Sequence, residues 1–317
     1  MTSSSSVGSG DFRYEFIENW EKMPDGYSWP ETASVITDRE DNVYVFNRGE
    51  HPMIVFNKQG DFIKSWGEGI FVRPHGLSLG PDETIYCTDD GDHTVRQCTL
   101  DGEILLTLGS AGNPSEAFSG FPFNRCTHTA SDPKTGDIFV TDGYGNSRIH
   151  RYSIEGEYID SWGEPGVGES EFNIVHNIAT DKEGYLYVCD RENHRIQVFN
   201  RRGEFEALWA NVHRPCAIYI DKLENIYVAE LGYGVSTSKN VPNIGPRISV
   251  LNKKGQVVQR IGHNGYGMNK GQFIAPHGIC LDSNLDIYVA EVARTNISHF
   301  MEPPESVRSF QKLKKVV

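Results

Sequence analysis

One short sequence phrase recurs six times along the chain and constrains the fold more than any other feature. Each copy has an aliphatic residue, then Tyr or Phe, then Val or Cys, and successive copies start about 40 to 60 residues apart. The copies are Val43-Tyr44-Val45, Ile85-Tyr86-Cys87, Ile138-Phe139-Val140, Leu186-Tyr187-Val188, Ile226-Tyr227-Val228 and Ile287-Tyr288-Val289. A repeat of this length is typical of the blades of a β-propeller.

Each copy belongs to a longer unit that alternates apolar and polar residues with period two. A second apolar run follows the phrase, as at 195–199, and a third ends in an aromatic residue, as at Trp66. This pattern predicts a sheet of about four short strands. One such sheet cannot bury both of its faces, whereas six sheets around an axis can. We therefore predict an all-β, six-bladed β-propeller.

The chain ends indicate how the ring closes. Residues 14–20 resemble the last strand of a blade, yet they precede the first repeat. We expect them to pair with the C-terminal repeat between Ile287 and Phe300, so that both ends of the chain complete the last blade. Residues 1–12 are rich in Ser and Gly and are expected to form a flexible leader, and residues 13–317 the propeller. The leader has no apolar segment of a signal peptide, which favours a cytoplasmic protein, or a secreted one whose signal was removed.

Composition excludes several kinds of partner. The formal net charge of -13 argues against nucleic acid or an anionic membrane as the main partner, because both favour a basic surface. No apolar run approaches the roughly 20 residues that span a bilayer. The six cysteines are expected to be reduced and mostly buried, with Cys87 and Cys98 facing each other across a hairpin as the exception to watch. The oligomeric state is not encoded in any of these features.

Three histidines occupy the same position in alternate repeats. Counting back 11 residues from Tyr86, Tyr187 and Tyr288 leads to His75, His176 and His277, which are 101 residues apart in each step. In a closed six-bladed ring they lie about 120° apart on the strands that line the channel. Three neutral imidazoles with an open fourth position form a typical catalytic zinc site, although other divalent transition metals also bind imidazole.

The same count reaches two further residues. It gives His128 in the third repeat and Cys216 in the fifth, which are additional candidate ligands or simply line the channel. A lone histidine on a strand is usually a hydrogen-bonded polar residue and not a ligand. The shared register, and not the residue type, therefore selects the three histidines.

Arg48 and Tyr144 lie just past the core of their inner strands, at one end of the predicted channel. An arginine near a metal can bind a substrate carboxylate through two hydrogen bonds. A tyrosine near a guanidinium and a dication can act as a base in its phenolate form. Taken alone, each residue could equally be structural.

With these residues the chain resembles the NHL-repeat propeller of peptidyl-α-hydroxyglycine α-amidating lyase. The matching motifs are Asn47-Arg48-Gly49-Glu50-His51, Pro74-His75-Gly76-Leu77-Ser78, Asp142-Gly143-Tyr144-Gly145-Asn146-Ser147-Arg148-Ile149, Val175-His176-Asn177-Ile178-Ala179, Asp190-Arg191-Glu192-Asn193 and Ala275-Pro276-His277.

The resemblance implies a metal-dependent cleavage of a C–N bond that releases an amide and glyoxylate. By this resemblance His75, His176 and His277 bind zinc. Tyr144 as a phenolate takes the proton of the substrate hydroxyl, and Arg48 steers the substrate carboxylate and stabilises the phenolate. The expected substrate is a small molecule or the C-terminus of a peptide.

Three positions depart from the family pattern. Gly145 stands where the family has a disulfide-bonded Cys, Gly278 where it has an Asp ligand to structural calcium, and Ala275 where it has Met. We therefore expect no structural calcium, a reducing compartment and a reshaped substrate pocket.

Two other functions fit the sequence. One is a zinc-dependent hydrolase or hydratase that uses metal-bound water. The other is a non-catalytic NHL-repeat module that binds a ligand or protein on one face.

Overall fold

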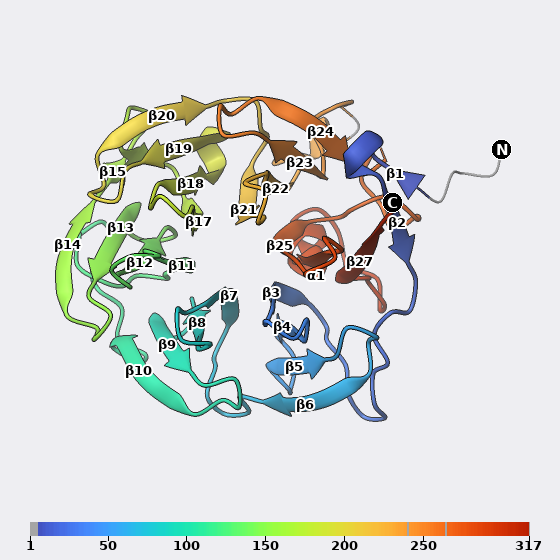
Figure 1. Cartoon of the computed structure of the whole chain (residues 1–317), viewed down its shortest axis with the longest axis horizontal. Coiled ribbons are helices and arrows are strands. Elements are labelled where there is room, and N and C mark those ends of the chain that lie inside the picture. Colours follow the sequence, from blue (N-terminus) through green and yellow to red (C-terminus); the bar gives the residue numbers. More distant parts are fainter. Residues whose placement is uncertain (1–5, 240, 264, 317) are drawn as a thin grey trace.

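The computed structural model describes residues 6–239, 241–263 and 265–316. Six antiparallel sheets are arranged as blades around a central axis, which confirms the six-bladed β-propeller (Figure 1). The first three blades are β3 (Thr32–Thr37), β4 (Val43–Asn47), β5 (Met53–Phe56) and β6 (Phe62–Trp66); β7 (Pro74–Leu79), β8 (Ile85–Asp89), β9 (Thr94–Cys98) and β10 (Ile104–Gly109); and β11 (His128–Ser131), β12 (Ile138–Asp142), β13 (Arg148–Tyr152) and β14 (Tyr158–Trp162).

The other three blades repeat this order. They are β17 (Val175–Thr180), β18 (Leu186–Asp190), β19 (Arg195–Phe199) and β20 (Phe205–Trp209); β21 (Pro215–Ile220), β22 (Ile226–Glu230), β23 (Arg247–Leu251) and β24 (Val257–Ile261); and β25 (Pro276–Leu281), β26 (Ile287–Glu291), β27 (Phe310–Lys315), β2 (Tyr14–Ile17) and β1 (Ser6–Val7). The remaining elements are the short parallel pair β15 (Glu164–Pro165) and β16 (Glu171–Phe172), the helix α1 (Ala293–Ser298) and the 3-10 turns η1 (Gly10–Phe12), η2 (Arg191–Asn193) and η3 (Ser236–Ser238).

The hydrophobic core lies between neighbouring blades. The aromatic residue of each repeated phrase is buried, and Tyr44 for example packs with Leu77 and Ile85 of the next blade. Tyr187 likewise packs with Ile218 and Ile226. Because each blade covers one face of the next, only the closed ring buries every sheet, as the repeat pattern predicts.

The ring closes through both ends of the chain. β2 pairs with β27, for example Tyr14 with Lys315, and β27 pairs with β26 (Figure 1). The predicted closure is therefore present, but the expected partner, residues 287–300, is corrected to 310–315 because α1 interrupts the blade after β26.

Part of the segment expected to be a leader belongs to the propeller. β1 pairs with β2, and Val7 is buried in the core beside Tyr14. Residues 1–5 of the expected leader lie outside the described residues, whereas residues 6–12 are packed on the last blade. The folded part therefore begins before residue 13.

All six cysteines are free and buried, as expected. Cys98 is the ladder partner of Ile85 and not of Cys87, so the two thiols are diagonal neighbours. Among the helices in the described ranges, none combines the length and the apolar character needed to cross a bilayer.

Candidate metal centre and active site

The three histidines at equal spacing meet in the channel. His75 lies on β7, His176 on β17 and His277 on β25, the innermost strands of alternate blades. Their ligating nitrogens lie within 4.8 Å of one another, and the ring centroids are 4.7 to 4.9 Å apart. Each residue is at most 4% exposed. The structure thus brings together the three histidines that were predicted from their equal spacing in the sequence.

A β-bulge turns each histidine toward the axis. In the second blade Pro74 pairs with Asp89 and Gly76 with Thr88, so that His75 has no ladder partner of its own. The ladders of β17 and β25 shift register at His176 and His277 in the same way. Bulges re-aim side chains in this manner and are common beside functional sites.

Backbone carbonyls of the neighbouring blades fix the orientation of the three rings. The Nδ1 atoms of His75, His176 and His277 each lie 2.7 Å from a carbonyl oxygen, of Thr127, Cys216 and Ala33 respectively. A carbonyl can only accept a hydrogen bond, so Nδ1 carries the proton and Nε2 keeps its lone pair. Metal-binding histidines are usually held by such an outer hydrogen bond.

Burial keeps these imidazoles neutral. It lowers the pKa of all three histidines well below the ordinary value, and the positive charge of nearby arginines acts in the same direction, Arg48 on His75 and His277 and Arg191 on His176. Neutral imidazole is the form that binds a metal. Three neutral nitrogen donors in a buried site therefore fit a divalent transition metal.

Two glycines make the close approach of the blades possible. A Cβ on Gly76 would lie 2.4 Å from the carbonyl oxygen of Thr127, which is the acceptor for His75. A Cβ on Gly278 would lie 2.7 Å from Cα of Ser34. Gly76 thus leaves room for the backbone of Thr127, which holds His75, and Gly278 for the backbone next to Ala33, which holds His277.

We expect Gly76→Ala to weaken metal binding by about 10- to 100-fold, because the added methyl group displaces the carbonyl that orients His75. Competition with a chromogenic chelator measures this change. Leu79→Ala is the control, since Leu79 lies on the same strand β7 but is 38% exposed, and the variant should keep the affinity of the unmodified protein. An unchanged affinity in Gly76→Ala would show that this carbonyl does not hold the ligand.

Tyr144 places its hydroxyl beside the histidines. It follows β12, and its oxygen lies 3.1 Å from Nε2 of His75 and 3.2 Å from Nε2 of His176. Nη1 of Arg191 lies 3.3 Å from the same oxygen, and the guanidinium of Arg125 is 4.5 Å from the centre of the tyrosine ring. The hydroxyl therefore lies between the Nε2 atoms of two of the histidines and two positive charges.

Arg48 lines the same cavity but does not contact Tyr144. Its Nη1 donates to Glu31 at 2.5 Å and to Thr295 at 3.3 Å, and its Nε donates to the carbonyl of Pro74 at 3.2 Å. Arg191 makes the contact with the tyrosine oxygen that was expected of Arg48. A signal for Arg191 was available, because it stands four residues after Tyr187, as Arg48 stands four after Tyr44.

A cavity of about 190 Å³ opens at this end of the channel. Its wall combines Tyr144 and His277 with five arginines and with the apolar residues Leu231 and Val292. The arginines are Arg48, Arg73, Arg125, Arg191 and Arg214. The arrangement suits a small anionic molecule with an apolar portion.

The loop that carries Tyr144 is held without a disulfide. The N–H of Gly145 donates to the carbonyl of Asn124 at 3.0 Å, and a Cβ on Gly145 would lie 2.3 Å from Cγ of Asn124. Asn124 also donates to the carbonyl of Ser115 at 2.8 Å. Amide hydrogen bonds therefore position the loop.

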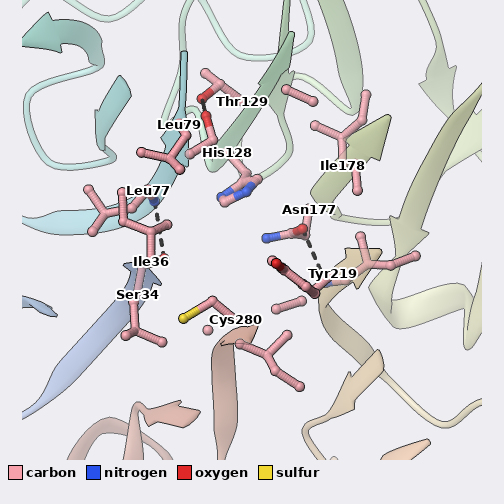
Figure 2. Close-up of a pocket in the computed structure, with 18 of the residues that line it drawn as sticks. Ser34, Ile36, Leu77, Leu79, His128, Thr129, Asn177, Ile178, Tyr219 and Cys280 are labelled. Carbon is pink, nitrogen blue, oxygen red and sulfur yellow. Dashed lines mark hydrogen bonds between the residues drawn. The ribbon is translucent and has the colours of Figure 1, made fainter. Parts of the chain in front are cut away.

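His128 does not join the three histidines. Six residues connect β11 to β12, where five connect β7 to β8, so counting back 11 residues from Phe139 stops one residue short of the equivalent position. Thr127 takes the ligand position of this blade, and His128 lines a second cavity of about 260 Å³ beyond the histidines. Figure 2 shows His128 and Asn177 pointing into that cavity from neighbouring inner strands. Cys216, at the ligand position of β21, holds His176 through its carbonyl.

The second cavity fits no calcium ion. Its described lining includes Ser34, Asn177, Tyr219 and Gly278 but no carboxylate. Calcium prefers several oxygen ligands with carboxylates among them. The side chains that line this cavity therefore offer no charged oxygen ligand for calcium.

Burial lowers the pKa of His128 to about 3. The unfolded chain binds a proton near pH 6.5, so this residue contributes stability above that pH and the contribution is lost as the pH falls from 6.5 toward 3. When the pH is lowered from 6.5 to 5, the free energy of unfolding of the metal-free protein should fall. In metal-free His128→Asn, which lacks this imidazole, we expect that fall to be smaller by roughly 2 kcal/mol. Denaturant unfolding at several pH values measures this difference, and parallel pH profiles would contradict it.

A second possible metal-binding group consists of three acidic residues, and a lysine already neutralises part of their charge. Asp181, Glu183 and Glu224 could hold an ion by their spacing, but Nζ of Lys253 lies 3.0, 2.8 and 3.0 Å from their carboxylates. The ammonium group fills the place of a cation.

Parts of the chain are similar to a known repeat family and to known proteins. The NHL repeat model matches residues 172–199. Peptidyl-alpha-hydroxyglycine alpha-amidating lyase 1 of Drosophila melanogaster is 33% identical over 261 residues, which cover 74% of this chain and 46% of the relative. NHL repeat-containing protein 3 of Homo sapiens is 28% identical over 210 residues, which cover 62% and 60%. The chain thus spans less than two thirds of the length of either relative.

A gluconolactonase from Xanthomonas campestris has the same fold, with a TM-score of 0.66, 9% identity and coverage of 99% of this chain and 95% of that one. At such low identity the likeness shows the fold alone. The fold defines the protein as a six-bladed β-propeller, and residues 172–199 match the NHL repeat. Within that class it resembles peptidyl-α-hydroxyglycine α-amidating lyase.

Proposed function

We propose that the protein is a zinc-dependent carbon–nitrogen lyase that acts on peptidyl-α-hydroxyglycine or a related small α-hydroxy-amide and releases an amide and glyoxylate. The observation that carries the proposal is the position of Tyr144, whose oxygen lies within 3.2 Å of two ligand nitrogens and 3.3 Å from Arg191. The amidating lyase relatives support the same assignment.

His75, His176 and His277 would hold the metal through Nε2. When bound, zinc supplies a Lewis acid that polarises the substrate oxygens. Tyr144, His277 and the arginines line the adjoining cavity, so a substrate bound there would lie beside the metal that the histidines would hold.

Tyr144 acts as the base. Its phenolate oxygen takes the proton of the substrate hydroxyl, and the O–H electron pair forms the aldehyde C=O bond of glyoxylate. The C–N bond breaks, its electron pair stays on nitrogen, and the proton held by Tyr144 passes to that nitrogen to give the amide. The guanidinium of Arg191, which donates toward the tyrosine oxygen, stabilises the phenolate.

Arg48 and Arg191 bind the carboxylate that becomes glyoxylate. Both side chains are nearly buried, at 13% and 11% exposed, and carboxylates hold them in place, the buried Glu31 for Arg48 and the partly buried Glu192 for Arg191. A guanidinium fixed in this way is oriented before the substrate arrives, so that less side-chain entropy is lost on binding.

The test is glyoxylate release from N-benzoyl-α-hydroxyglycine by zinc-loaded protein. We expect glyoxylate and benzamide in equal amounts, and no release after removal of the metal with a chelator. A protein that retains zinc but releases no glyoxylate from this substrate or from a peptidyl-α-hydroxyglycine would contradict the proposed reaction while leaving the metal site intact.

A further inference from the structure

The mouth of the cavity carries more positive charge than its own carboxylates neutralise. Five arginines line it, and they bind three carboxylates. Glu31 pairs with Arg48, Asp90 with both Arg73 and Arg125, and Glu192 with both Arg191 and Arg214. Two positive charges therefore remain, in a chain whose formal net charge is -13.

One of these charges belongs to the pair Arg73 and Arg125. Both guanidinium groups donate to the same oxygen, Oδ2 of the fully buried Asp90, with Arg125 Nη2 at 2.7 Å. Within the described ranges, Nε and Nη2 of Arg73 and Nη1 of Arg125 have no hydrogen-bond partner. The pair thus has donors left for an anion.

Exposure distinguishes this pair from the other arginines of the cavity. The side chains of Arg73 and Arg125 are 34% and 43% exposed, against 11 to 13% for Arg48, Arg191 and Arg214. Arg214 is occupied by Glu192 and by the carbonyl of Tyr233. Besides Arg48 and Arg191, which are assigned to the substrate carboxylate, Arg73 and Arg125 are therefore the more exposed arginines at this mouth, with donors left for a second anionic group.

The pair lies next to the reacting centre. Arg125 stacks over the ring of Tyr144 at 4.5 Å, and Arg73 is two residues before His75. A group bound by the pair and a carboxylate bound by Arg48 and Arg191 occupy one cavity of about 190 Å³. Two anionic groups this close together belong to one small molecule.

Guanidinium groups recognise carboxylates well, because their N–H donors match the two carboxylate oxygens. We propose that Arg73 and Arg125 form a second anion subsite, and that the substrate is a small α-hydroxy-amide with an additional carboxylate on its amide half. This inference rests on the proposed lyase function and narrows its substrate class to dianionic molecules.

The test compares two substrates that differ only in charge, N-(3-carboxybenzoyl)-α-hydroxyglycine and its 3-carbamoyl analogue. We expect kcat/KM to be about 10- to 100-fold higher for the carboxylate, the range for hydrogen bonds to a charged group. The ratio should fall toward one in Arg73→Gln and in Arg125→Gln, each of which leaves one arginine on Asp90. Arg39→Gln removes an equal charge from an exposed hairpin, and it should keep the ratio of the unmodified protein.

Binding of unreactive analogues separates this inference from the lyase reaction. N-(3-carboxybenzoyl)glycine and N-(3-carbamoylbenzoyl)glycine lack the hydroxyl group and cannot react, so calorimetry with zinc-loaded protein reports the subsite alone. Tighter binding of the carboxylate, lost in both arginine variants, supports the subsite even when no glyoxylate forms. Equal affinity for the two analogues, or a preference that survives both variants, would overturn it.

Discussion

Tyr144→Phe is expected to lower kcat for glyoxylate release by about 10²- to 10⁴-fold, the usual contribution of a general base. The variant keeps the ring that stacks with Arg125 but removes the oxygen that lies beside His75 and His176. Metal content and thermal stability should stay close to those of the unmodified protein, since the histidines keep their carbonyl partners.

Steady-state kinetics on zinc-loaded protein measures this effect. The result also separates the lyase from the hydrolase alternative, in which metal-bound water replaces the tyrosine as the reactive group. A variant that keeps most of its activity with a full complement of zinc would remove Tyr144 from the mechanism.

His176→Ala is expected to abolish the thermal stabilisation that zinc gives the unmodified protein. A ligand present at 1,000 times its dissociation constant stabilises the folded state by about 4 kcal/mol. Loss of one of three protein ligands leaves two imidazoles, which hold the ion much less tightly. Glyoxylate release should fall below detection in the same variant.

Differential scanning calorimetry with and without zinc measures the stabilisation. His51→Ala is the matched control, because His51 stacks on Tyr27 outside the channel and should respond to zinc as the unmodified protein does. A zinc-dependent shift of equal size in His176→Ala would mean that the ion binds elsewhere.

The fold and the histidine group could be predicted because both depend on a strict repeat. Apolar phrases at regular spacing determine the blades, and the 101-residue separation places His75, His176 and His277 on alternate inner strands. The carbonyls of Ala33, Thr127 and Cys216 that orient these rings could not be predicted, because any residue provides a backbone carbonyl.

The structure departs from the expected register where the repeat is irregular. One additional residue before β12 moved His128 out of register, and α1 displaced the strand that pairs with β2. Arg191 was missed for another reason. Its contact with Tyr144 joins two blades, and only the comparison of equivalent positions around the ring brings such residues together.

The most direct test of the metal centre is anomalous diffraction at the zinc absorption edge, from crystals of protein purified without chelators. We predict one peak in the channel, about 2.0 to 2.1 Å from Nε2 of His75, His176 and His277, with density for a further ligand on the side of Tyr144. A zinc-loaded crystal with no peak between these nitrogens, or with zinc bound only elsewhere, would contradict the account.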